Sequence, residues 1–300
     1  MVVKKKVPLF HREGRWTSLT SKPDDGQTAT LAKTVLWLSH ETDWSDLYVS
    51  FIFVDFRRLF CFVMFTMSGI VAHHVRILDT SMYSRVIVIS DVHGCVEALD
   101  RLLDKLNVTA DFDGSDLLIF VGDLVNKGPD GPGVVRRVQS LTGALSVRGN
   151  HEEKLNKDKE ISDQDKFTED ELNYLKNLPL SISLVDRNLV IVHAGIKTGV
   201  EMEKQKKDDL LRMRTIDVRT GETSDEGEDE FHQPWARLYP GPQFVVFGHH
   251  AKLGLQREKF ALGIDTGCVY GRELTAAVFP RGRSTGEYEL VHVVGNSLSA

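Results

Sequence analysis

From residue 85 onward, short apolar runs alternate with stretches in which apolar residues recur at helical spacing. The β-branched run 86–89 predicts a strand buried on both faces. Apolar residues between Val96 and Leu106 then mark one face of a helix. The order repeats with the apolar run 117–121 and a second helical stretch after Pro132, a residue that suits the first turn of a helix.

The remaining apolar runs are short and become more frequent toward the C-terminus. They predict strands at residues 145–147, 189–192, 244–247, 260–264, 274–279 and 290–294. Strands that alternate with helices, followed by a strand-rich end, predict a layered α/β domain. The acidic, glycine-containing run 221–230 is expected to be a solvated loop.

Metal-ligand residue types follow directly after several of these predicted strands. Since ligands bind at the carboxyl ends of strands in α/β sheets, we expect these side chains to meet at one edge. Carboxylate, imidazole and amide oxygen together suit Mn, Fe or Zn, and one carboxylate can bridge two metals. The residues are Asp91, His93, Asp123, Asn150, His193 and His249.

Each of these residues also has a plainer explanation when taken alone. A strand-end aspartate is often a turn or cap residue, and Asn150 could simply cap a helix. All of them in this order, each after an apolar run, favour a metal site.

The complete pattern resembles the calcineurin-like metallophosphoesterases over residues 85–295. Within that superfamily it is most similar to the ApaH-like phosphatases, which belong with the phosphoprotein phosphatases. The resemblance implies an α/β fold of two stacked mixed β-sheets flanked by helices. It rests on the motifs at 91–94, 122–129, 148–152, 193–195 and 248–249, on Gln205, Met213 and Arg214, and on residues 263–271.

The resemblance also implies a role for each site residue. Two divalent metal ions (Mn, Fe, Zn or Co) are expected, with Asp123 between them. Asp91 and His93 would hold the first metal, and Asn150, His193 and His249 the second. His151 would be the general acid. Arg148 would offer a guanidinium fork to phosphate, although a surface ion pair is its alternative.

One departure from the family pattern bears on the substrate. Asn126 and Lys127 stand where protein phosphatases of this class usually carry Asp and Arg. Asn126 can hydrogen-bond the catalytic imidazole but cannot stabilise its charged form, and Lys127 loses the bidentate fork. Arg214 and Tyr270 are further candidates for binding substrate phosphate, and Lys252 is a weaker one.

Three functions from different classes fit these residues. The first is hydrolysis of phosphoanhydrides such as diadenosine tetraphosphate, polyphosphate or an mRNA cap. The second is a protein serine/threonine phosphatase, against which the departure at Asn126 and Lys127 argues. The third, a scaffold with this fold but no chemistry, is disfavoured by the full ligand set together with His151.

Residues 1–84 are expected to be an N-terminal extension, with the phosphoesterase domain at 85–300. The apolar segment 59–71 is shorter than the roughly 20 residues that a spanning helix needs. It could be a buried extension, a membrane anchor or internal signal, or translated non-coding sequence.

Composition narrows the class of partner and compartment. With a net charge of −6 we expect no duplex nucleic acid partner, because no global basic field exists. A phosphate-bearing small molecule or polyphosphate remains the expected partner. The three cysteines lie far apart in the sequence and form no CxxC pair, so we expect no disulfide framework. We therefore expect a cytoplasmic location.

Overall fold

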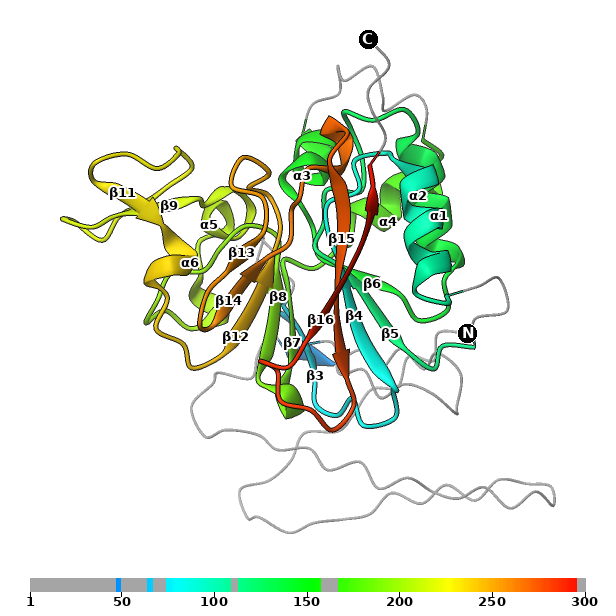
Figure 1. Ribbon diagram of the computed structural model, residues 1–300, viewed down its shortest axis with the longest axis horizontal. Helices are drawn as coiled ribbons and strands as arrows, with labels where there is room; N and C mark the ends of the chain where they lie inside the picture. The colour runs from blue at the N-terminus through cyan, green and yellow to red at the C-terminus, as the bar shows by residue number, and fades with distance from the viewer. Residues whose placement is uncertain (1–46, 50–63, 67–73, 109–112, 158–166, 296–300) are drawn as a thin grey trace. The chain divides into compact units, whose positions relative to one another are not determined.

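The computed structural model describes residues 47–49, 64–66, 74–108, 113–157 and 167–295 (Figure 1). Near the N-terminus, β1 (Leu47–Val49) pairs antiparallel with β2 (Met64–Thr66). Of the apolar segment 59–71, the structure describes only residues 64–66. The alternatives given for this segment therefore lie outside the described residues. No described helix is both long and apolar enough to cross a membrane.

One sheet has five strands in the order β16-β15-β4-β5-β6. The positions of its parallel strands β4, β5 and β6 were predicted closely. The antiparallel pair β15–β16 closes one edge, where β15 also pairs antiparallel with β4. The sheet is therefore mixed. Its strands are β4 (Arg85–Ile89), β5 (Leu117–Phe120), β6 (Leu145–Ser146), β15 (Glu273–Pro280) and β16 (Glu289–Val294).

The second sheet has six strands in the order β13-β14-β12-β8-β7-β3. The pairs β14–β12, β12–β8 and β7–β3 are parallel, and β13–β14 and β7–β8 are antiparallel, so this sheet is also mixed. Its strands are β3 (His74–Ile77), β7 (Ser181–Leu184), β8 (Leu189–Val192), β12 (Phe244–Phe247), β13 (Gln256–Arg257) and β14 (Ala261–Gly263).

The two sheets stack face to face because alternate residues of each central strand are apolar. In β4, Val86 and Val88 pack between the sheets, whereas Ile87 and Ile89 face the helices. In β8, Leu189 and Ile191 occupy the same inter-sheet core. Both faces of these strands are buried, which explains their continuous apolar runs.

Helices cover the outer face of each sheet (Figure 1). On the five-stranded sheet lie α1 (Val96–Lys105), α2 (Gly131–Ser140) and α4 (Glu169–Lys176), with α3 (Asn150–Lys157) beside α4. Capping fixes where two of them begin. Asp130 Oδ1 accepts from the Gly133 N–H at 2.7 Å, and Thr168 and Glu171 form a capping box.

The outer face of the six-stranded sheet packs on α5 (Lys207–Arg212) and α6 (Trp235–Leu238). Between these helices in the sequence lies a small antiparallel sheet. The acidic run 221–230 contributes its strand β10 and the following loop, and is mostly exposed as expected. Its strands are β9 (Thr215–Asp217), β10 (Thr223–Ser224) and β11 (His232–Pro234). The described residues also contain three short 3₁₀ segments: η3 (Val185–Arg187), η4 (Met202–Lys204) and η5 (Cys268–Tyr270).

The stacked mixed sheets and flanking helices confirm the expected fold class. The short strands β1, β2, β9, β10, β11 and β13 were not predicted. Neither were β3 and β7, which pair in parallel from His74 opposite Ser181 to Ile77 opposite Leu184. β3 precedes the domain boundary expected at residue 85, so the six-stranded sheet already begins at His74.

Candidate metal centre

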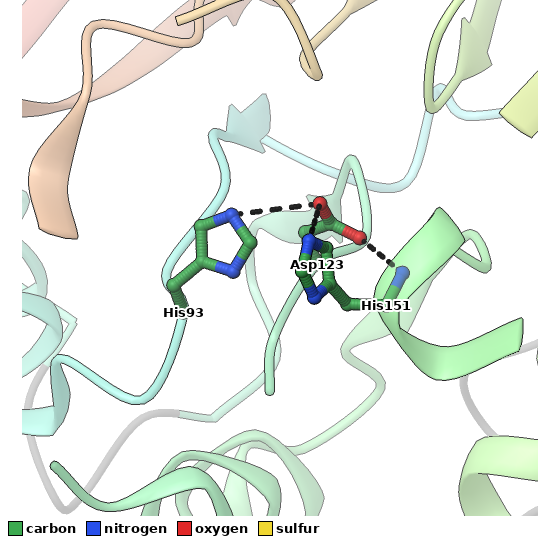
Figure 2. A group of neighbouring side chains, drawn as sticks. All are labelled: His93, Asp123 and His151. Atoms are coloured by element: carbon green, nitrogen blue, oxygen red, sulfur yellow. Dashed lines mark hydrogen bonds and ion pairs between the residues drawn. The ribbon is translucent and has the colours of Figure 1, made fainter. Parts of the chain in front are cut away.

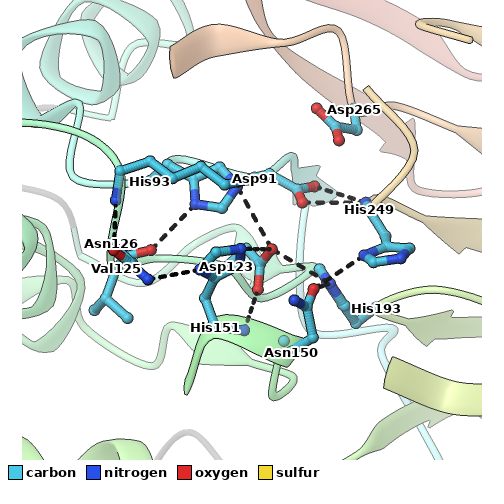
Figure 3. A network of polar contacts seen from close by, with 12 residues as sticks. Asp91, His93, Asp123, Val125, Asn126, Asn150, His151, His193, His249 and Asp265 are labelled. Carbon is cyan, nitrogen blue, oxygen red and sulfur yellow. Dashed lines mark hydrogen bonds and ion pairs between the residues drawn. The ribbon is translucent and has the colours of Figure 1, made fainter. Parts of the chain in front are cut away.

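The predicted ligands meet where β4, β5, β8 and β12 end and α3 begins (Figure 3). Three of them sit on backbone in the left-handed region, with φ of 48° at His93, 50° at Asp123 and 67° at His249. Non-glycine residues seldom adopt this conformation, and when they do they cluster at functional sites. The chain thus turns sharply at the end of three strands and aims these side chains toward one another.

Asp123 lies at the middle of the cluster (Figure 2). Its Oδ2 is 3.5 Å from Nε2 of His93, 3.5 Å from Nε2 of His193 and 4.0 Å from Nε2 of His151. Two groups of possible ligand atoms share it, each with all atoms within 4.8 Å of one another. They are His93, Asp123 and His151, and Asp123, His193 and His249.

Backbone carbonyls fix which ring nitrogen of each histidine carries a proton. Nδ1 of His93 and of His193 donates to Val125 O at 3.1 Å and Val121 O at 2.9 Å, which leaves both Nε2 atoms bare. His249 is reversed, because its Nε2 donates to Arg212 O at 3.1 Å and leaves Nδ1 bare. A carbonyl that orients the ring in this way is the usual support of a metal-binding histidine.

The bare nitrogens face other acceptors. Oδ1 of Asn150 is 3.0 Å from Nε2 of His193 and 3.0 Å from Nδ1 of His249. Three lone pairs that point at one another repel unless a cation lies between them. The donor set therefore fits the expected metal.

Burial sets the protonation of the three histidines in the direction that metal binding requires. It lowers the pKa of His193 to about 4 and places the pKa of His93 and His249 well below the usual range, so the imidazoles are neutral at pH 7. Burial also raises the pKa of Asp123 to about 7. Only neutral imidazole and ionised carboxylate bind a metal, and a cation would restore the carboxylate charge.

Asp91 lies in the site but outside both groups. Its Oδ2 and Oδ1 accept from the His249 N–H at 3.1 and 3.3 Å (Figure 3). A Cβ at Gly248 would collide with Oδ1 of Asp91, so only glycine permits this approach. Burial and the charges of Asp265 and Asp123 raise the pKa of Asp91 well above its usual range.

His151 stands on the first turn of α3 and bonds to Asn126. Oδ1 of Asn126 accepts from the Lys127 N–H at 2.8 Å, so its amide Nδ2 is the atom 2.9 Å from Nδ1 of His151. Nδ1 must then accept, and the ring proton is on Nε2, the atom that faces Asp123. Burial, with the Lys127 charge, lowers the pKa of His151 to about 3.

Lys127 also extends into the metal centre, where it contacts His93. Its ammonium is 3.2 Å from Nε2 of His93, the lone pair that a metal would use. The ammonium therefore places a positive charge beside His93.

The structure shows where the Arg148 side chain lies. Its Nη2 donates to Lys176 O at 2.6 Å and Leu178 O at 2.9 Å, and its Nη1 pairs with Glu153 at 3.2 Å. The side chain is buried at the C-terminal end of α4, where its Nε has no hydrogen-bond partner among the described residues. Arg148 therefore forms a buried ion pair, rather than the surface ion pair that was the alternative to its predicted phosphate-binding role.

The other phosphate candidates lie around the rim. Arg214 donates from Nη1 to Asp225 O at 2.6 Å, and its charge reaches His249 and His250. Tyr270 is exposed, with the Lys127 ammonium over its ring. Lys252, whose charge also reaches His250, is exposed.

Two buried carboxylates of the site were not predicted. Glu152 accepts from the backbone N–H of Asp123, Leu124, Val125 and Gly149 at 2.9, 2.8, 3.3 and 2.7 Å. Asp265 follows β14 and lies near Asp91 (Figure 3). The rule that identified the other residues, an acidic side chain directly after an apolar run, would also have identified Asp265.

Comparison with known proteins agrees with this geometry. The family model described as calcineurin-like phosphoesterase matches residues 84–254. A bis(5'-nucleosyl)-tetraphosphatase PrpE [asymmetrical] from Oceanobacillus iheyensis is 31% identical over 229 residues, which are 65% of this chain and 89% of the relative. A symmetrical bis(5'-nucleosyl)-tetraphosphatase from Ralstonia nicotianae is 31% identical over 264 residues, 65% of this chain and 90% of the relative.

Solved structures show the same similarity. The crystal structure of a candidate diadenosine tetraphosphatase is 39% identical, with a TM-score of 0.66, and the match covers 75% of this chain and 99% of that one. A protein serine/threonine phosphatase from Saccharomyces cerevisiae matches at 14% identity and a TM-score of 0.50, over 73% of this chain and 82% of that one, and shows the fold alone. With the matched motifs, the stacked sheets and the histidine–aspartate cluster in place, this chain belongs to the calcineurin-like phosphoesterase family.

Proposed function

We propose that this protein is a two-metal-dependent hydrolase of phosphoanhydride bonds, and that its substrates are dinucleoside polyphosphates of the diadenosine tetraphosphate type. One observation carries the proposal: bare nitrogens of buried histidines converge with Asn150 and Asp123 where strands of both sheets end. His93, Asp123 and Asp91 would hold one metal, and Asp123, Asn150, His193 and His249 the other. Mn, Fe, Zn and Co all suit this mixture of ligands.

The chain's own residues then account for the chemistry. Bound metals supply Lewis-acid stabilisation of the charge on the transferred phosphoryl group. Lys127 adds a positive charge beside His93, where it can bind a phosphate oxygen once a metal takes the His93 lone pair. His151 directs its Nε2 proton into the site and can donate it to the leaving oxygen.

The contact between Asn126 and His151 favours anhydrides over phosphomonoesters. The Asn126 amide donates to Nδ1 of His151, so it stabilises the neutral ring and opposes the imidazolium. A neutral imidazole is a weak acid. A phosphate or pyrophosphate anion leaves with little help, whereas a serine alkoxide needs its proton as the bond breaks, so the anhydride suits this acid better.

The relatives support the same substrate class. The two relatives described above carry the name bis(5'-nucleosyl)-tetraphosphatase, one asymmetrical and one symmetrical. Nucleotide substrates and the scarcity of cysteine also favour a cytoplasmic location.

Steady-state kinetics on two substrate types test the proposal. Purified protein is stripped of metal, reloaded with Mn, Co, Zn or Mg in turn, and assayed on diadenosine tetraphosphate and on a phosphoserine peptide. We expect kcat/KM to be higher for the tetraphosphate with every metal that supports turnover. A protein that prefers the phosphopeptide would instead be a serine/threonine phosphatase, and one inactive on both would contradict the proposal.

A further inference from the structure

Tyr270 is a large aromatic residue held in the open at the rim of the metal centre. It ends the 3₁₀ turn η5 and is 53% exposed. Within the described part of the chain, its hydroxyl forms no hydrogen bond.

The backbone under this ring is firmly held. The Tyr270 N–H donates to Gly267 O at 3.0 Å, and Arg272 Nη2 donates to Ala251 O at 2.6 Å. Gly267 and Gly271 on either side have φ of 80° and 75°, which suits glycine and defines the turn. The ring is thus presented from a fixed support, so ordering it on binding costs little entropy.

Lys127 relates the ring to the reaction centre. Its Nζ lies 5.6 Å from the centroid of Tyr270 and 3.2 Å from Nε2 of His93. The Lys127 ammonium therefore lies between the aromatic face and a nitrogen that we expect to bind metal. A group bonded to the phosphate chain of a bound substrate would extend across this ring.

Exposure alone carries no argument, because isolated exposed apolar side chains are common. Leu78 is 55% exposed, yet it follows β3 at the end of the sheet away from the metal centre. Position distinguishes Tyr270, since it combines an aromatic face, a fixed backbone and a neighbouring cation beside the reacting phosphate.

We propose that the Tyr270 ring is the stacking platform for a nucleobase of the substrate, and that it selects nucleotide-bearing polyphosphates over inorganic polyphosphate. This inference rests on the proposed function. Lys127 would bind phosphate while the base lies on the ring, and because every base has a π-face, adenine and guanine should be accepted alike.

A contact between the Tyr270 hydroxyl and phosphate, the role that the family resemblance suggests, makes a different prediction. Replacement by Phe removes the hydroxyl and keeps the ring, whereas Leu removes the ring and keeps an apolar side chain. We expect Tyr270→Phe to behave as wild type and Tyr270→Leu to lose base selection.

The first experiment measures the ratio of kcat/KM for diadenosine tetraphosphate to that for inorganic tripolyphosphate, which has no base. For Tyr270→Leu this ratio should fall roughly 5- to 20-fold through a higher KM for the nucleotide, as loss of one base stack implies. Leu78→Ala, a similarly exposed site far from the centre, should leave the ratio unchanged. A ratio unchanged in Tyr270→Leu, or lowered equally in Tyr270→Phe, would overturn the inference.

The second experiment does not depend on turnover. In a Tyr270→Trp variant, AMP should quench the added indole fluorescence, measured as the difference from wild type, whereas inorganic phosphate should not. Equal responses to both ligands would refute stacking. Wild type inactive on both polyphosphates would refute the proposed function instead, so the two failures can be told apart.

Discussion

Among single residues, the side-chain amide of Asn126 determines which nitrogen of His151 carries the ring proton. It donates to Nδ1 of His151 at 2.9 Å and thereby places the ring proton on Nε2. We predict that His151→Ala keeps its metal content and loses roughly 10²- to 10⁴-fold in turnover on a phosphomonoester. The loss on diadenosine tetraphosphate should be smaller, because pyrophosphate-type groups leave more easily.

Asn126→Asp is the matched variant for this prediction. A carboxylate would accept from Nδ1, raise the pKa of His151 and favour the imidazolium. Phosphomonoester turnover should rise and anhydride turnover should change little. An equal loss on both substrates in His151→Ala would show that His151 does not protonate the leaving group.

Asp123 is the only side chain shared by both groups of possible ligands among the described residues. We predict that Asp123→Asn binds fewer than two metals per chain, since a neutral amide cannot offset charge on two cations. Metal content after dialysis, by elemental analysis, measures this. Asp116→Asn, a change of the same kind at a buried residue paired with Arg85, should retain two metals. Two metals in Asp123→Asn would refute the bridging role.

The residues predicted to bind metal each follow an apolar run, and the structure brings them together because the strands of both sheets end at the same place. Sequence reasoning did not identify Glu152, whose partners are four backbone N–H groups that no sequence pattern shows. It did not predict the buried contacts of Arg148, because a position beside the predicted ligands does not reveal which way a side chain turns. Glu153 and the carbonyls at the end of α4 determine that direction.

Between elements, Glu152 joins α3 to the loop after β5. Its carboxylate binds the N–H groups of Asp123, Leu124, Val125 and Gly149, and it is fully buried. We predict that Glu152→Ala lowers the free energy of unfolding by about 3 kcal/mol or more, because buried donors lose their acceptor. Urea denaturation of metal-free protein measures this. Glu152→Gln keeps one acceptor oxygen and should lose less of the free energy of unfolding. Equal stability of Glu152→Ala and wild type would show that Glu152 does not hold the loop after β5.

The strands β3 and β7 escaped prediction because each alternates polar and apolar residues over only four positions. One pair of their polar side chains is joined across the two strands, since Nδ1 of His74 bonds Ser181 Oγ at 2.7 Å. Such a pairing depends on partners 107 residues apart and leaves no local pattern. The uninterrupted apolar runs of β4, β5 and β8 are local signals and were predicted without such a partner.

This pairing also predicts a pH dependence. Burial lowers the pKa of His74, partly opposed by the Glu203 charge, so the folded state prefers the neutral ring. The unfolded chain binds a proton below about pH 6.5, and the free energy of unfolding therefore falls as the pH drops below that value. Between pH 7.5 and 5, His74→Gln should lose less stability than wild type in chemical denaturation. Parallel pH profiles would rule out this contribution.

For the molecule as a whole, local periodicity predicted strands and helices but not their stacking. The expectation of two sheets came from the family resemblance. It holds because strands such as β4 and β12 are apolar on both faces and need a layer on each side. Which strands form the outer edges was not predictable, because edge strands such as β3 are short and half polar.

The N-terminal boundary of the domain can be tested by truncation. All metal-centre residues lie after residue 90, so a chain of residues 72–300 should fold, bind metals and retain turnover. A chain of residues 85–300 lacks β3 and removes Ile77 and Tyr83, which are 3% and 5% exposed, from the inter-sheet core. Loss of one such buried side chain costs about 2–5 kcal/mol, so the shorter chain should unfold at lower urea concentration. An inactive 72–300 chain would show that the N-terminal residues are part of the enzyme, and equal stability of the two chains would return the boundary to residue 85.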